Sequence, residues 1–117
     1  MVEIIREFIV KEEARGRFEL MYGPGGAWGR LFAPCAGYRG SALLRDVRDA
    51  RRYLAVDFWD AESQYEQALA ERRVEYAELE AALGGWTESR AKVGAFRVLA
   101  EATVRSPAGP RGRRIAR

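Results

Sequence analysis

The stretch that most constrains the fold runs from Arg52 to Tyr76 and reads RYLAVDFWDAESQYEQALAERRVEY. Its first part alternates in character as the side chains of a strand do, so it predicts a strand with two distinct faces. We expect the aliphatic face to lie in the core, and it carries Leu54, Val56 and Phe58. The second face mixes aromatic residues with an acid, which is typical of a sheet face that meets something other than a helix; it carries Tyr53, Ala55, Asp57 and Trp59.

A helix is predicted directly after this strand. Asp60 has a short acceptor side chain that suits an N-cap, so the helix should begin at Ala61, and Gly84-Gly85 should end it. Its apolar stripe comprises Tyr65, Leu69, Tyr76, Leu79 and Leu83. Arg72 lies where this stripe needs an apolar residue. We therefore expect its guanidinium to reach water, to meet an acid or to face a cavity.

The other segments complete the order strand, helix pair, strand, strand, helix, strand, which is the split βαβ pattern of ferredoxin-like folds. The fold class predicted is thus α+β, with helices on one face of a four-stranded antiparallel sheet. The further strands are expected at 2–11, 41–47 and 92–99, the helix pair at 12–22 and 27–33, and a hairpin loop at 48–51.

The sheet face away from the helices should be too apolar for water in so short a chain. A homodimer that brings two such sheets together across a two-fold axis would cover it. We therefore expect a dimer from the residues alone.

Composition separates a folded body from a basic tail. The 117 residues suffice for one domain, expected at 1–103, and 104–117 should form a basic, disordered tail. Residues 105–117 hold five arginines and no acid, which leaves 15 basic and 17 acidic residues in the body. A slightly acidic body argues against a nucleic-acid-binding face, although the tail could add weak attraction to an anionic partner.

Several classes of protein are excluded or disfavoured by what the sequence lacks. No stretch is long and apolar enough to cross a bilayer, and acids interrupt the N-terminal apolar run, so we expect a cytoplasmic protein with no membrane partner. With one cysteine and no histidine, a Cys/His metal site is excluded. Cys35 is expected to pack rather than to act as a nucleophile, because no imidazole can activate it.

Three segments together resemble the antibiotic biosynthesis monooxygenase family of dimeric α+β barrels. They read VEIIREFIVKEEARGRFELMYG, GGAWGRLF and YLAVDFWDAESQYEQALAERRVEY, and the resemblance spans roughly residues 2 to 100. It implies a homodimer with a pocket in each subunit between the sheet and the helices. Some members of this family oxidise aromatic compounds with molecular oxygen and no metal or flavin, and others degrade haem.

The resemblance extends to single residues, with two departures. Trp59 matches the tryptophan that lines the pocket in functional members. Ala55 stands where oxygenase members often place an asparagine, and Arg72 stands at a helix position that is frequently histidine. Without any histidine, haem ligation through a helix histidine is excluded.

A cofactor-free oxidation needs a dry aromatic pocket and a cation that holds the substrate anion. The catalytic candidates are Trp59, Arg72 and Asp57, and the candidates for the substrate pocket are Trp28, Phe32, Arg45, Tyr53 and Tyr65. Asp57 could orient an arginine, act as a base or pair across the strands with Arg45; Trp28, Phe32 and Tyr65 could instead be core residues.

Two functions remain open. The first is a cofactor-independent monooxygenase, with no cofactor or metal, acting on a small aromatic or hydrophobic metabolite. The second is a non-catalytic ligand-binding dimer that keeps the pocket but has lost the oxygenase residues, which Ala55 favours. Nucleic-acid binding through the arginine tail is the weakest alternative.

Overall fold

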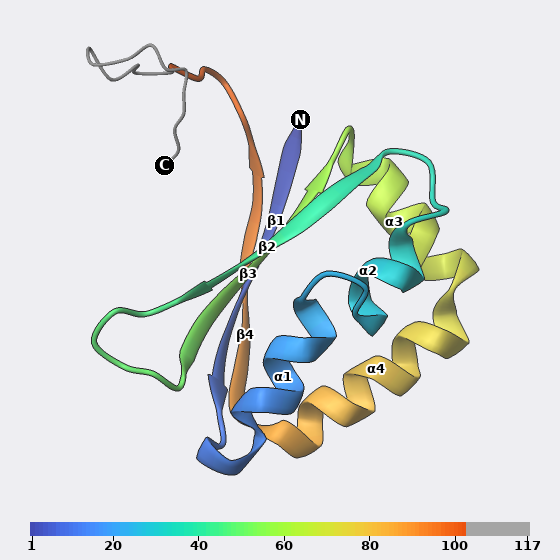
Figure 1. Ribbon diagram of the computed structural model, residues 1–117. Helices are drawn as coiled ribbons and strands as arrows, with labels where there is room; N and C mark the ends of the chain where they lie inside the picture. Colours follow the sequence, from blue (N-terminus) through green and yellow to red (C-terminus); the bar gives the residue numbers. More distant parts are fainter. Residues whose placement is uncertain (103–117) are drawn as a thin grey trace, which may run out of the picture.

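A computed structural model describes residues 1–102 and shows an antiparallel sheet with all its helices on one face (Figure 1). The strands are β1 (Val2–Val10), β2 (Tyr38–Arg45), β3 (Arg52–Trp59) and β4 (Thr87–Arg97), in the spatial order β2-β3-β1-β4. The helices are η1 (Glu12–Ala14), α1 (Arg15–Tyr22), α2 (Ala27–Phe32), α3 (Glu62–Glu71) and α4 (Arg73–Trp86). The predicted α+β, ferredoxin-like architecture is confirmed.

The prediction of one long helix from residue 61 is wrong in three details. It begins at Glu62, and Asp60 does not cap it but pairs with Arg39 at 2.8 Å. It divides at Arg72, whose φ of −110° and ψ of 31° separate α3 from α4. It also continues through Gly84 and Gly85, because Leu83 anchors the last turn in the core.

A larger correction concerns the two faces of β3. Tyr53, Ala55 and Trp59 are at most 2% exposed and lie under the helices. Leu54 and Phe58 instead lie on the face that no helix covers. The predicted alternation is confirmed, but the face of β3 that lies under the helices is the opposite of the one predicted. Large aromatic rings fill the space between sheet and helices better than aliphatic side chains do.

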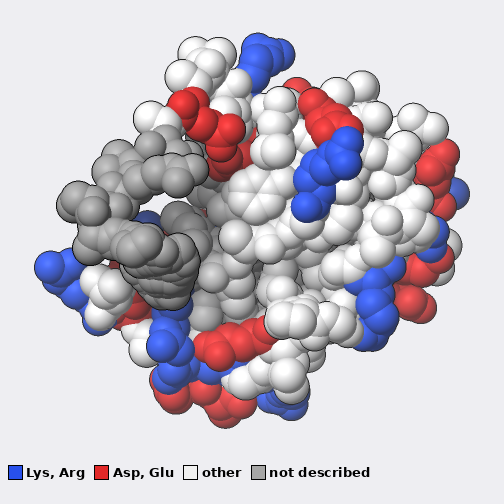
Figure 2. Space-filling model, turned by 45° about the horizontal axis from the view of Figure 1, so that its top comes forward, with Lys and Arg blue, Asp and Glu red and all other residues white. Residues whose placement is uncertain are grey.

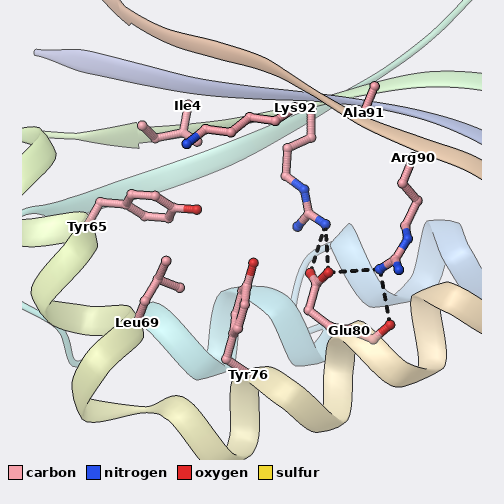
Figure 3. Close-up of a pocket in the computed structure, with 9 residues that line it drawn as sticks. Ile4, Tyr65, Leu69, Tyr76, Glu80, Arg90, Ala91 and Lys92 are labelled. Carbon is pink, nitrogen blue, oxygen red and sulfur yellow. Dashed lines mark hydrogen bonds and ion pairs between the residues drawn. The ribbon is translucent and has the colours of Figure 1, made fainter.

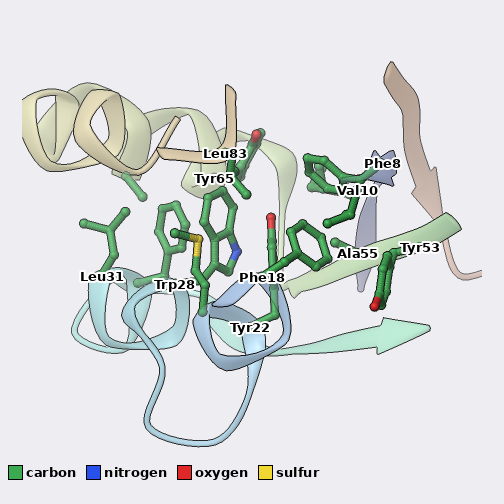
Figure 4. Close-up of a cluster of buried hydrophobic side chains, with 14 of the residues drawn as sticks. Phe8, Val10, Phe18, Tyr22, Trp28, Leu31, Tyr53, Ala55, Tyr65 and Leu83 are labelled. Atoms are coloured by element: carbon green, nitrogen blue, oxygen red, sulfur yellow. The ribbon is translucent and has the colours of Figure 1, made fainter. Parts of the chain in front are cut away.

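The core under α1 and α2 is a cluster of aromatic rings, which we call the aromatic cluster (Figure 4). Neighbouring rings are tilted or edge-to-face, with centroids 4.8 Å apart for Phe18 and Tyr53 and 5.2 Å apart for Phe8 and Phe18. Such pairs stabilise the fold beyond their buried area. The cluster comprises Phe8, Phe18, Tyr22, Trp28, Phe32 and Tyr53.

No helix covers the opposite sheet face, and most of its side chains are apolar, as expected, but they are other residues than those predicted, and Glu3, Glu7 and Arg52 share the face. Strand register places Ile5 beside Val56 and Leu44 beside Leu54 on it. Leu44 is 51% and Phe96 49% exposed. We call this surface the open face, and its apolar members are Ile5, Ile9, Ala42, Leu44, Leu54, Val56, Phe58 and Phe96.

Within residues 1–102 no helix is long and apolar enough to cross a membrane. Acidic and basic side chains are interspersed on the face drawn in Figure 2. The domain boundary expected at 103/104 and the basic tail lie outside the described residues.

Candidate functional site

A cavity of about 430 Å³ lies between the sheet and the helices α3 and α4 (Figure 3). Both strands β1 and β4 contribute to its sheet side. Apolar and charged residues share its wall, which is lined by Ile4, Arg6, Tyr65, Leu69, Tyr76, Glu80, Arg90, Ala91 and Lys92.

The positive side of the cavity follows from the period of the strands. Arg6 alternates with Ile4 and Phe8 along β1, so it points under the helices as they do. In the register of β1 with β4, Arg90 pairs with Phe8 and Lys92 with Arg6. Three cations are therefore brought to the same sheet face.

Glu80 of α4 bridges two of these cations. Its carboxylate lies 2.8 Å from Nη2 of Arg6 and 2.8 Å from Nη1 of Arg90. Arg90 also donates to the Glu80 backbone carbonyl at 3.3 Å. The cavity thus keeps three cations against a single carboxylate among its lining residues.

Arg6 is held in an aromatic setting that leaves its Nη1 without a hydrogen-bond partner in the described residues. Its guanidinium carbon lies 4.9 Å from the ring centre of Phe8 and 5.5 Å from that of Trp28. Burial acts to lower the pKa of Arg6, but Tyr22 and Glu80 outweigh it and the pKa is raised. Its Nη1 is shielded from water and has no hydrogen-bond partner within residues 1–102.

Two phenols face the same cavity. Burial raises the pKa of Tyr65 and of Tyr76, and Arg6 only partly offsets this effect. Both side chains are therefore neutral hydrogen-bond donors across the physiological range. With Leu69 beside them (Figure 3), they form a wall suited to a planar ring.

Asp57 lies outside this wall, in a buried hydrogen-bond network. Its Oδ1 accepts from Trp28 Nε1 at 2.9 Å and from Ser41 Oγ at 2.5 Å. Burial raises the pKa of Asp57, and these two hydrogen bonds counteract it in part. The possible pairing of Asp57 with Arg45 is wrong, since Asp57 registers with Ser41 and Arg45 with Tyr53.

The other predicted site residues are dispersed. Trp59 is fully buried with its ring 5.7 Å from that of Tyr65, and its Nε1 has no partner within residues 1–102. Arg45 pairs with Glu19 at 3.3 Å, and Arg72, half-exposed, lies 3.8 Å from Glu75. Trp28, Phe32 and Tyr53 belong to the aromatic cluster. Of the eight candidates only Tyr65 lines the cavity.

Sequence reasoning missed the charged half of the site. Arg6 carried a usable signal, because it interrupts the otherwise apolar alternation of Val2, Ile4, Phe8 and Val10. Arg90 carried none, because the strand was expected to begin only at Lys92, whereas β4 begins at Thr87. No group of three or more potential metal ligands occurs in the described part of the chain.

Comparison with solved structures shows the fold that carries this cavity. A variant of SnoaB, a cofactor-independent oxygenase from Streptomyces nogalater, is 22% identical, with a TM-score of 0.68 over 86% of this chain and 94% of that one. A protein from Nitrosomonas europaea named as an antibiotic biosynthesis monooxygenase is 14% identical, with a TM-score of 0.68 over 84% and 89%.

A third similar structure is a mutant of MhuD with two manganese protoporphyrin IX molecules bound per active site, 19% identical, with a TM-score of 0.64 over 89% of this chain and all of that one. No family model and no curated protein matches the sequence. At these identities the comparisons show that the chain has the antibiotic biosynthesis monooxygenase fold.

Proposed function

We propose that this protein oxidises a small, ionisable aromatic compound with molecular oxygen, without metal or flavin, in the cavity between α3, α4 and the sheet. The observation that carries the proposal is the wall itself, where two neutral phenols, Tyr65 and Tyr76, face the cations Arg6, Arg90 and Lys92. Structural likeness to a cofactor-independent oxygenase supports it.

Such a reaction balances without an external reductant. A methylene group beside a hydroxylated ring loses two hydrogens and gains one oxygen atom, and the second oxygen atom leaves as water with those hydrogens. The substrate thus supplies all four electrons that reduce O2. What the protein must supply is stabilisation of the carbanion or phenolate that reacts with oxygen.

The charges of the wall fit this requirement. Arg90 and Lys92 lie on the edge strand β4 and Arg6 next to them on β1, so a substrate ring against Tyr65 and Tyr76 would lie beside positive charge. The carboxylate of Glu80 is already engaged by two arginines. The substrate must therefore be acidic enough to lose its proton with the help of the cations alone.

Trp59 would act through Tyr65 rather than on the substrate. Its ring packs edge-on against Tyr65 and is itself held by Phe32 and Tyr38. The indole therefore sets the position of a cavity phenol.

Oxygen consumption on a panel of hydroxylated anthrones, which carry such a methylene group, tests the proposal. We expect uptake of one O2 per product formed, and a fall of about a hundredfold in kcat/KM for Arg90→Met. The matched control is Arg39→Met, which removes an exposed arginine paired with Asp60 outside the cavity and should leave the rate unchanged. Uptake no faster than in buffer on every compound would reject the oxidation.

A non-catalytic ligand-binding protein is the second candidate. Ala55 brings no polar group under the helices, where it is 2% exposed. On this alternative the same aromatic compounds bind but are recovered unchanged.

We also propose that the protein is a homodimer in which two open faces meet. No helix covers the apolar side chains there, and Leu44 and Phe96 are about half exposed. Sedimentation equilibrium should give twice the chain mass for the wild type and one chain mass for Phe96→Asp. A wild-type protein that stays monomeric at every concentration would contradict the dimer.

A further inference from the structure

Arg6 is placed unusually for a residue that serves only the fold. Its side chain is 12% exposed, it lies near the rings of Phe8 and Trp28, and it lines the cavity. A structural ion pair with Glu80 would use its donors on that partner, yet only Nη2 does so, through contacts of 3.0 Å and 2.8 Å to the two carboxylate oxygens. Nη1 is left without a partner in the described residues.

The charge around Arg6 is also incompletely balanced. Glu80 is shared with Arg90, and Lys92 has no ion-pair partner within residues 1–102. The remaining polar groups of the wall, the hydroxyls of Tyr65 and Tyr76, are neutral. An oxyanion entering the cavity would meet an excess of positive charge and donors of the geometry that a guanidinium offers to a planar or tetrahedral anion.

We infer that Arg6 is the specificity-determining residue of the cavity. It binds a group of an aromatic ligand that is already anionic at neutral pH, either a carboxylate or a sulfonate. Glu80 is a positioning residue, because it holds Nη2 and so fixes the plane of the guanidinium. This inference rests on the proposed function for the aromatic nature of the ligand, and it adds the charge that the ligand must bear.

A pair of fluorescent probes that differ in one group isolates that charge. The probes are 1-anilinonaphthalene-8-sulfonate and the uncharged N-phenyl-1-naphthylamine, which share the same ring system. We expect the wild type to bind the sulfonate about tenfold or more tightly than the neutral probe. Arg6→Met should bind both equally, Arg6→Lys should keep part of the preference, and Arg39→Met should keep all of it.

Two further variants test whether the probes bind in the cavity or on the open face. Leu69→Trp narrows the cavity and should weaken binding of both probes, whereas Phe96→Asp alters the open face and should not. Glu80→Gln should weaken the preference for the sulfonate although it makes the wall more positive, because Arg6 is then free to turn. A rise in sulfonate affinity in Glu80→Gln would show that Glu80 acts as a competing anion and not as a positioning residue.

The test separates this inference from the oxidation. An anion preference that vanishes in Arg6→Met, in a protein that consumes no oxygen, supports the inference and rejects the oxidation. If the protein consumes oxygen and the ratio of probe affinities is the same in wild type and Arg6→Met, the oxidation is supported and the inference is rejected. Equal binding of the two probes by the wild type overturns the inference directly.

Discussion

The two ends of the helix-covered sheet face are built in different ways. Under α1 and α2 the space is filled by interlocking rings, where Trp28 and Ser41 both donate to Asp57 and the Tyr22 hydroxyl has no partner within residues 1–102. Under α3 and α4 a cavity remains, and among its lining residues the cations outnumber the carboxylate. The first end is a core and the second holds the candidate site, although both belong to one layer.

The two ends also differ in the residue types that build them. Aromatic residues dominate the filled end, where Trp28 and Phe32 contact each other with ring centres 5.2 Å apart. Charged residues that point under the helices, above all Arg6 and Glu80, mark the other end. Buried charge is costly without a reason, so it is the more specific signal.

The largest expected effect is the loss of a ring from the filled end. Trp28→Ala removes a side chain that is 1% exposed and contacts the rings of Tyr22 and Phe32, and it deprives Asp57 of a donor. We expect the free energy of unfolding to fall by about 3–5 kcal/mol. Urea denaturation followed by far-UV circular dichroism measures it.

The matched control for this change lies in the cavity wall. Leu69→Ala removes a half-buried side chain that already borders empty space, so its cost should be roughly 1 kcal/mol. Equal losses in the free energy of unfolding for Trp28→Ala and Leu69→Ala would contradict the distinction between a filled and an unfilled end.

Replacing either partner of the ion pair between Arg6 and Glu80 should change the free energy of unfolding by a smaller amount, and the two replacements should differ in their effect. Glu80→Met leaves the Arg6 guanidinium largely buried without its carboxylate and should cost about 2 kcal/mol. Arg6→Met places an apolar chain beside Phe8 and Trp28 while Glu80 keeps Arg90, so it should change stability by less than about 1 kcal/mol.

The double variant completes a thermodynamic cycle for this pair. It should be more stable than Glu80→Met alone, because the unpaired charge is gone. If Arg6→Met were the more destabilising single change, Arg6 would be a structural residue and its proposed role in ligand binding would lose its basis.

The order and type of the elements could be predicted because they depend on local periodicity. The alternation in β1 and β3 is regular, and Gly23 to Gly26 separates α1 from α2 as a turn. What failed depended on distant contacts. Helix α4 passes through two glycines because its end is fixed by a distant segment, where Lys11 N–H donates to the Trp86 carbonyl at 2.8 Å.

The site was less predictable for a related reason. A period of two identifies both faces of β3 but does not say which one meets the helices, and this exchange placed Trp59 and Tyr53 in the wrong layer. The predicted cations were Arg72 in the helix or Arg45 on β2, yet the cavity takes its cations from β1 and β4. Their meeting with Glu80 depends on strand register, which no single segment contains.

The smallest expected effect concerns Asp57 and is a dependence on pH. Burial raises its pKa above the ordinary value of 3.8, so on rising pH the unfolded chain loses this proton before the folded one does. The unfolded state then binds fewer protons, and Asp57 lowers stability as pH rises from 3.8 through the raised pKa. Asp57→Asn keeps an Oδ1 that can accept from Trp28 and Ser41 but has no proton to lose.

The free energy of unfolding of Asp57→Asn minus that of the wild type should therefore increase across this range and then level off, by about 1.4 kcal/mol for each unit of pKa shift. Asp46→Asn is the opposite control. The Arg48 backbone N–H and the Arg52 side chain lower the pKa of Asp46, so the wild type should gain stability relative to that variant as pH rises towards 3.8. A pH-independent difference for Asp57→Asn would mean that the filled end does not penalise a charge, and that only the cavity end distinguishes charged from neutral groups.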